Sequence, residues 1–254
     1  MVFHTFGDSK KKAVLLLHGM LTPWTIWEEM IAYFSKDSYV IVPELDAHTL
    51  EEESRFESVE KEAEILREYL LENTGGKLFL LCGLSLGGRI SAVLAGLPDI
   101  HVENMVLDGA PLLQVPGFMI SFMKSNYKSI IRRSRIRDEK VLESAKRSFL
   151  PEKRLPDYLV IADHISQESV EKIIDSAFNS FHFRKYDDCR ILFMHGTKGN
   201  ESLSEKAAVK MKAVNPEMQI ACYKGYAHAQ LLCFEPEKWV GEVKTWIKSE
   251  KMVP

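Results

Sequence analysis

The chain has 254 residues, of which 33 are lysine or arginine and 36 are aspartate or glutamate, and its formal net charge is −3. This balance gives no reason to expect a nucleic acid or an anionic membrane as a partner. Hydrophobic residues make up 46% and charged residues 27% of the chain, which is ordinary for a soluble globular protein with one large domain.

Four cysteines are scattered along the chain, at Cys82, Cys189, Cys222 and Cys233. They form no C-x-x-C pair, and reduced cysteines of cytosolic proteins are distributed in this way. The N-terminal segment lacks the apolar core of a signal peptide, and no apolar run approaches the ~20 residues that cross a bilayer. No metal-ligand spacing, P-loop or dinucleotide fingerprint is present. We therefore expect a cytoplasmic protein without membrane span, metal or cofactor; the sequence leaves open whether it forms a homo-oligomer.

Short apolar runs alternate with amphipathic segments along most of the chain. The apolar runs predict strands, and apolar residues at helical spacing predict helices. The predicted strands cover residues 2–6, 13–17, 38–42, 78–82, 102–107, 190–194 and 218–223. The predicted helices cover residues 24–34, 51–73, 202–214 and 237–248, with a further helix after Gly87. Apolar strands separated by helices indicate an α/β protein with a mostly parallel sheet flanked by helices.

The alternation of strands and helices stops after residue 111. The stretch that follows has several helical patterns but no convincing strand, and it is too long for a simple crossover. We predict a helical lid at residues 112–187, inserted over the carboxyl edge of a core domain that comprises residues 1–111 and 188–254. An apolar block at residues 118–123 is expected either to line an acyl pocket or to form the lid's own core. A basic cluster in the lid is interpreted as a solvated helix face: Arg132, Arg133, Arg135 and Arg137.

The pattern that points to chemistry is Gly83-Leu84-Ser85-Leu86-Gly87, between a predicted strand and a predicted helix. A G-x-S-x-G motif in this context is a nucleophile elbow, in which the serine lies on a sharp turn. Glycine is needed on both sides because larger side chains would collide as the strand and the helix close. The start of the helix also brings free N–H groups beside the serine oxygen. We predict that Ser85 is a nucleophile.

A serine nucleophile needs a base within hydrogen-bond reach. Of the eight histidines, His228 lies in a loop between the last predicted strand and the last predicted helix, on the same edge of the sheet as the elbow. Catalytic groups collect at that edge in open α/β sheets. We therefore predict His228 as the base. The other histidines, including His18, His48 and His195, are expected to have structural or surface roles.

Together, these features resemble the α/β-hydrolase fold: Ser85 in its elbow, His18-Gly19 after an early strand, a helical insertion and a late loop histidine. The likeness covers nearly the whole chain. It implies an oxyanion hole made of two backbone N–H groups, which here would belong to Leu86 and to Met20, with Leu21 as an alternative to Met20. Such donors act where negative charge develops in the reaction.

The acid that completes the triad is less clearly indicated. The family most often has an aspartate in a His-Gly-x-x-Asp pattern after the strand at 190–194, but this sequence has Gly199 where that aspartate would fall. Three possibilities follow: Glu201, two residues later, could serve; Asp108, at the end of the preceding strand, could serve as in pancreatic-lipase-like members; or the acid is absent. We favour Asp108, because a strand end holds a carboxylate more rigidly than a glycine-rich loop.

The sequence thus predicts a serine hydrolase for a small to medium carboxylic ester with an apolar acyl group, with an acyl-enzyme on Ser85 and His228 as general base. The fold alone does not determine the reaction, so thioesterase, amidase, perhydrolase, acyltransferase and C–C hydrolase activities stay open. The alternative from another class is a non-catalytic protein that binds a small molecule on a hydrolase scaffold. It is suggested by the missing aspartate after the strand at 190–194.

Overall fold

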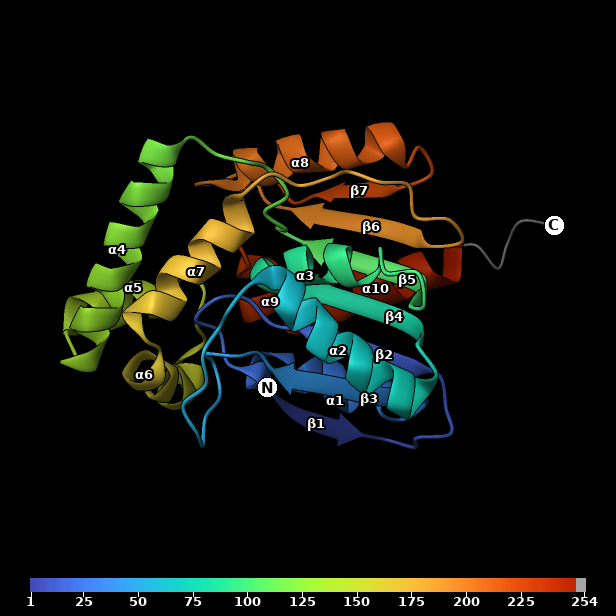
Figure 1. Ribbon diagram of the computed structural model, residues 1–254, viewed down its shortest axis with the longest axis horizontal. Coiled ribbons are helices and arrows are strands. Elements are labelled where there is room, and N and C mark those ends of the chain that lie inside the picture. The colour runs from blue at the N-terminus through green and yellow to red at the C-terminus, as the bar shows by residue number, and fades with distance from the viewer. Residues whose placement is uncertain (250–254) are drawn as a thin grey trace.

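Seven strands form one sheet in the order β1-β3-β2-β4-β5-β6-β7 (Figure 1). The structure is a computed structural model, and it describes residues 1–249. β1 pairs antiparallel with β3, and every other neighbouring pair is parallel. The strands are β1 (Val2–Phe6), β2 (Ala13–Leu17), β3 (Tyr39–Glu44), β4 (Lys77–Leu84), β5 (His101–Asp108), β6 (Arg190–His195) and β7 (Gln219–Cys222).

Helices cover both faces of this sheet, so the central strands are buried on both sides. All five residues of β2 are buried, and Leu15 packs in one core cluster while Leu16 packs in the other. One face is covered by α2 (Val59–Thr74), α3 (Leu86–Leu94) and α8 (Glu201–Val214), and the other by α1 (Glu28–Phe34), α9 (Gln230–Phe234) and α10 (Pro236–Lys248). A short 3-10 turn, η1 (Trp24–Trp27), leads into α1. The mostly parallel sheet flanked by helices is confirmed.

Four helices fill the segment between β5 and β6: α4 (Gly117–Arg135), α5 (Glu139–Ser148), α6 (Leu155–His164) and α7 (Gln167–Phe178), with the short turn η2 (Glu152–Arg154) before α6. They gather beyond the carboxyl ends of the parallel strands (Figure 1). We call residues 112–187 the helical insertion. In the apolar block at its start, Phe118 and Phe122 are exposed to solvent at 76% and 72%, so neither expectation for this block holds for these two side chains.

Most arginines of the basic cluster form ion pairs or hydrogen bonds within the helical insertion. Arg133 pairs with Asp138, and Arg137 pairs with Asp163. The Arg135 guanidinium donates to the carbonyl oxygens of residues 162 and 165. These contacts tie α4 to α6 and to the start of α5, which is a structural use rather than an anion site.

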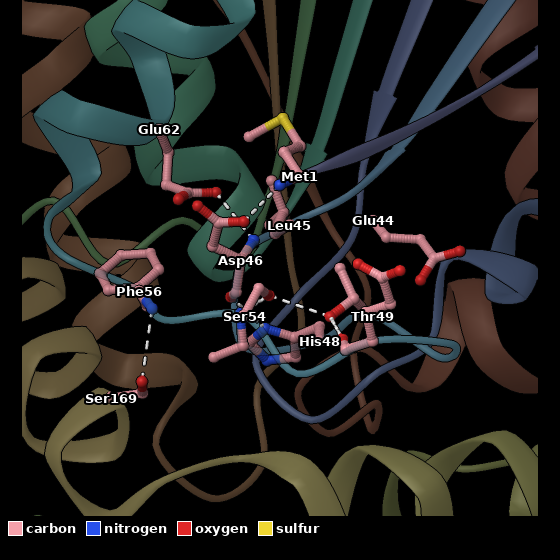
Figure 2. Close-up of polar contacts among 12 residues, drawn as sticks. Met1, Glu44, Leu45, Asp46, His48, Thr49, Ser54, Phe56, Glu62 and Ser169 are labelled. Atoms are coloured by element: carbon pink, nitrogen blue, oxygen red, sulfur yellow. Dashed lines mark hydrogen bonds and ion pairs between the residues drawn. The ribbon is translucent and has the colours of Figure 1, made fainter.

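Two helix predictions differ from the structure. The helix expected over residues 51–73 begins only at Val59, after Ser58, whose side chain caps the Lys61 N–H. The preceding residues are not helical, and the N–H of Phe56 is bonded outside the segment, because it donates to Ser169 Oγ of α7 (Figure 2). The second difference is α9, five residues long, which has too few residues to show a helical period in the sequence.

Within residues 1–249, no helix combines the length and the apolar character needed to cross a membrane. All four cysteines have free thiols.

Candidate active site

Ser85 sits on a strained turn between β4 and α3. Its backbone has φ 51° and ψ −113°, a conformation that non-glycine residues rarely adopt. A Cβ on Gly83 would lie 2.4 Å from the Gly87 carbonyl oxygen, and one on Gly87 would lie 2.2 Å from the Leu17 carbonyl oxygen. Both positions therefore require glycine. The N–H of Ser85 donates to the carbonyl oxygen of Asp108 at 2.8 Å, which fixes the turn to β5.

His228 lies in the loop between β7 and α9, and its ring is hydrogen-bonded to Glu201. The distance from His228 Nδ1 to Glu201 Oε1 is 2.6 Å. Glu201 is only 1% exposed, and its other oxygen, Oε2, accepts from the Gly196 N–H at 2.6 Å. Because an ionised carboxylate can only accept, Nδ1 carries the proton and Nε2 is the free ring nitrogen. The Glu201 contact thus selects the tautomer that a general base needs.

The preference for Asp108 as the partner of His228 is corrected by this geometry. Asp108 Oδ2 accepts a hydrogen bond from Trp239 Nε1 of α10 at 2.9 Å, whereas the carboxylate bonded to the imidazole is that of Glu201. The glycine-rich loop after β6 is expected to hold a carboxylate less rigidly than a strand end does. In fact Glu201 opens α8, and the Gly196 amide fixes its side chain.

Charge and burial shift the pKa values of His228, Glu201 and Asp108 in different ways. Burial alone would lower the pKa of His228, but the hydrogen bond and the charge of Glu201, with a further contribution from Asp108, raise it. Burial alone would raise the pKa of Glu201, but the His228 contact and the Gly196 N–H outweigh it and lower this pKa. For Asp108, burial dominates and raises the pKa to about 7.

The backbone N–H groups of Met20 and Leu86, residues that line the same cavity as Ser85, have no hydrogen-bond partner in the described part of the chain. The N–H of Leu21, the alternative donor, is occupied, because it donates to His48 Nε2 at 3.0 Å. Free N–H groups at these positions are what an oxyanion hole requires. Of the two alternatives, the geometry thus favours Met20.

Two buried histidines hold the loop that carries Met20. His18 Nε2 accepts from the Leu45 N–H at 3.1 Å, and His48 Nε2 accepts from the Leu21 N–H. Burial lowers the pKa of His18 to about 3 and that of His48 to about 4, so both rings are neutral acceptors. The segment that bears His48 is cross-linked in turn, since Ser54 Oγ accepts from a backbone N–H at 2.7 Å and bonds to Thr49 Oγ1 at 2.9 Å (Figure 2).

Ser85, His228, Met20 and Leu86 all line one cavity of about 70 Å³ under the helical insertion. Its other walls are mainly aliphatic and come from the β5–α4 connection, α4, α7 and α8. Ser85 Oγ has no hydrogen-bond partner among residues 1–249 and is therefore free to meet a ligand there. A larger hollow of about 1060 Å³ lies at the amino ends of β5 and β6, away from these groups. We assign no chemistry to it.

Within the described residues, no group of three or more histidine, cysteine or acidic side chains is arranged to hold a metal ion.

The comparisons with known proteins identify the fold. A protein-family model described as "alpha/beta hydrolase fold" matches residues 12–130. A solved structure of an alpha/beta hydrolase family protein from Desulfitobacterium hafniense is 21% identical, with a TM-score of 0.79, and covers 97% of this chain and 100% of its own. The protein has the α/β-hydrolase fold.

Other solved structures with the α/β-hydrolase fold are similar over nearly the whole chain. The esterase RhEst1 from Rhodococcus sp. ECU1013 is 21% identical, with a TM-score of 0.71, and covers 97% of this chain and 94% of its own. MenH from S. aureus is 15% identical, with a TM-score of 0.73 and a coverage of 98% of both chains. No curated protein matches the sequence significantly.

Some residues of this α/β-hydrolase site could not be recognised from the sequence. His48 gave no local signal, because its contact with Leu21 joins positions 27 residues apart. Tyr127 and Asn200 also line the cavity, and no motif marks either. Glu201 was one of the three possibilities that the sequence left open for the acid, because it is the first carboxylate after the glycine-rich loop that follows β6.

The burial of Asp108 leads to a stability prediction. Its pKa is raised from 3.8 to about 7, so the folded state holds this proton more tightly than the unfolded state does. The contribution of Asp108 to stability therefore falls as the pH rises from about 4 to 7. Asp108→Asn should remove this loss of stability at high pH, because the asparagine side chain does not ionise. Its amide oxygen can still accept the hydrogen bond from Trp239. Thermal unfolding should show a higher melting temperature than wild type at pH 8 and no gain at pH 4; a lower value at pH 8 would contradict the assignment.

Proposed function

We propose that the protein is a serine hydrolase that cleaves carboxylic esters through an acyl-enzyme on Ser85. The observation that carries this proposal is the pairing of His228 Nδ1 with the buried Glu201 carboxylate, while Ser85 on its strained elbow lines the same cavity as His228. A nucleophile, a base and a group that orients the base are the parts of nucleophilic acyl transfer. The similarity to a structure named an esterase agrees with it.

In the proposed reaction, Ser85 Oγ attacks the ester carbonyl and its proton passes to His228 Nε2. Glu201 stabilises the imidazolium that forms, and the N–H groups of Met20 and Leu86 receive the negative charge on the carbonyl oxygen. The intermediate then breaks its bond to the leaving alcohol, which takes the proton from His228. Water, activated by the same imidazole, attacks the acyl-enzyme and releases the carboxylic acid and free Ser85.

The size and lining of the cavity indicate which acyl groups it can accommodate. At about 70 Å³ it is roughly half of the ~150 Å³ that accommodates a benzene molecule. Its walls include Leu112, Ile173 and Leu203. These features favour a short apolar acyl group; a longer one would require displacement of the helical insertion.

The alternative of a non-catalytic binding protein was suggested by the missing aspartate after β6. Glu201 provides a carboxylate on His228 and removes that reason.

We also propose that the protein is located in the cytoplasm, where its four free thiols would stay reduced.

A series of p-nitrophenyl esters with acyl chains from two to twelve carbons tests the proposed function. We expect saturable turnover with the highest kcat/KM for the shortest chains, because only these fit the cavity without movement of the insertion. Absence of turnover across the series, in protein shown to be folded, would reject the esterase proposal in favour of a binding protein or another reaction of the fold.

The pH dependence gives a second test. His228 must be neutral to act as a base, and its pKa is raised above 6.5 mainly by Glu201 against the effect of burial. We expect kcat/KM to fall on the acid side with an apparent pKa above 6.5. In Glu201→Gln, the residual activity should titrate at lower pH. A profile whose acid limb stays in place in that variant would show that Glu201 does not set the protonation of His228.

A further inference from the structure

Tyr127, on α4 of the helical insertion, has a hydroxyl that the rest of the described chain does not use. It lines the cavity that contains Ser85 and His228, and burial raises the pKa of its phenol. No hydrogen bond joins it to another of residues 1–249. By contrast, Tyr158 is bonded to Ser134 Oγ at 2.7 Å and Tyr186 to a carbonyl oxygen at 2.7 Å. Tyr127 is half-buried, so a molecule bound in the cavity can take the place of water as the hydrogen-bond partner of its hydroxyl.

The position of Tyr127 distinguishes it from the other tyrosines whose hydroxyls make no hydrogen bond with residues 1–249. Tyr223 has a fully buried hydroxyl without a hydrogen bond, and the Tyr33 hydroxyl makes none either, but neither residue lines the cavity. Only the Tyr127 hydroxyl could therefore be satisfied by a molecule bound next to Ser85. The substrate is therefore the candidate partner of this hydroxyl in the bound state.

A second polar side chain on the cavity wall is uncommitted as well. Asn200 occupies the N-cap position of α8, where asparagine usually accepts a hydrogen bond from the first turn, but here it makes no cap bond. It lies directly before Glu201 and lines the same cavity. The cavity thus receives polar groups from two sides: Tyr127 from the insertion and Asn200 from the core.

The side chains that line the cavity limit which polar groups of a substrate can bind there. Among the described residues that line it there is no lysine, arginine, aspartate or glutamate. A carboxylate, phosphate or ammonium group on the substrate would lose its hydration without a counter-charge. A neutral oxygen needs no counter-charge, and it could accept a hydrogen bond from the phenol of Tyr127.

We propose that Tyr127 is a specificity-determining residue that donates a hydrogen bond to a neutral oxygen in the acyl group of the substrate. The preferred substrates are then short esters whose acyl chain carries an ether, keto or hydroxyl oxygen besides the ester itself. The acyl group is the part concerned because it stays attached to Ser85 in both steps of the reaction. This inference rests on the proposed esterase function and extends it.

The test uses two pairs of p-nitrophenyl esters in which an ether oxygen replaces one methylene of the acyl chain: butyrate with methoxyacetate, and pentanoate with 3-methoxypropanoate. For each ester, kcat/KM is measured in wild type and in Tyr127→Phe. Comparison of wild type with variant on the same ester cancels the intrinsic reactivity of that ester. We expect Tyr127→Phe to lower kcat/KM about tenfold for at least one ether ester and less than about twofold for its hydrocarbon partner.

Tyr33→Phe is the matched control, because Tyr33 lies on α1 and does not line the cavity. It should leave all four values unchanged. The melting temperature of Tyr127→Phe should equal or exceed that of wild type, since the lost hydroxyl has no partner to leave behind. A lower melting temperature, or the same change in kcat/KM for ether and hydrocarbon esters, would overturn the role of Tyr127. If wild type hydrolyses none of the four esters and Ser85 does not react with a fluorophosphonate, the proposed function itself fails.

Discussion

Replacing Ser85 with alanine is expected to lower kcat for a short p-nitrophenyl ester by about 10⁶-fold, to the level left by binding alone. Ser85 Oγ forms the bond to the acyl group in the proposed reaction, and no other hydroxyl can take its place on the elbow. The variant should remain folded, because Ser85 Oγ makes no hydrogen bond within residues 1–249. Active-site turnover and thermal unfolding, measured on the same preparation, separate loss of chemistry from loss of structure.

Ser121→Ala provides the control for the loss of a serine hydroxyl. Ser121 lies exposed on α4, where its Oγ donates to the Gly117 carbonyl oxygen within the helix. Its removal should leave kcat within about twofold of wild type, since surface substitutions of this kind have small effects. Equal activity of Ser85→Ala and wild type would mean that another residue is the nucleophile.

Glu201→Gln is the second change with a large expected effect, a fall in kcat of about 10⁴-fold. The substitution keeps the size of the side chain but removes the charge that stabilises the imidazolium, and a glutamine amide that donates to Nδ1 would select the wrong tautomer of His228. Asp108→Asn is the matched control, because it also neutralises a buried carboxylate close to His228. Its side chain is bonded to Trp239, so kcat should fall less than about tenfold.

The comparison of these two variants decides between the two carboxylates. A fall of several orders of magnitude in Asp108→Asn, with little change in Glu201→Gln, would restore Asp108 as the orienting acid. A large fall in both would indicate that the imidazolium depends on both charges, in line with the contribution of each to the raised pKa of His228.

The sequence was sufficient to predict the sheet and the turn that carries Ser85, because those features are local. The elbow needs its glycines beside Ser85, and buried strands such as β2 need continuous apolar residues. The orienting acid depends instead on how a loop folds in three dimensions. The Gly196 N–H captures Glu201 across a five-residue separation, and the side chain of Asp108 turns to Trp239 131 residues away.

Dependence on three-dimensional packing also explains why the sequence did not predict which side chains of the helical insertion are buried. Helical spacing predicted that residues 112–187 are helical, but it could not show which side chains meet the core. Phe118 and Phe122 looked like core and are exposed, whereas Tyr127 on the same helix lines the cavity. Which helix face is covered depends on the packing of α4 against α6 and α7, and this packing joins segments distant in the sequence.

The most direct measurement is the reaction of the purified protein with a fluorophosphonate, followed by mass spectrometry of its peptides. If Ser85 is activated by the His228–Glu201 pair, the probe should label one residue per chain, Ser85, and labelling should be slowed by orders of magnitude in Glu201→Gln. Failure to label the folded wild-type protein, or attachment of the probe at another residue, would contradict the account.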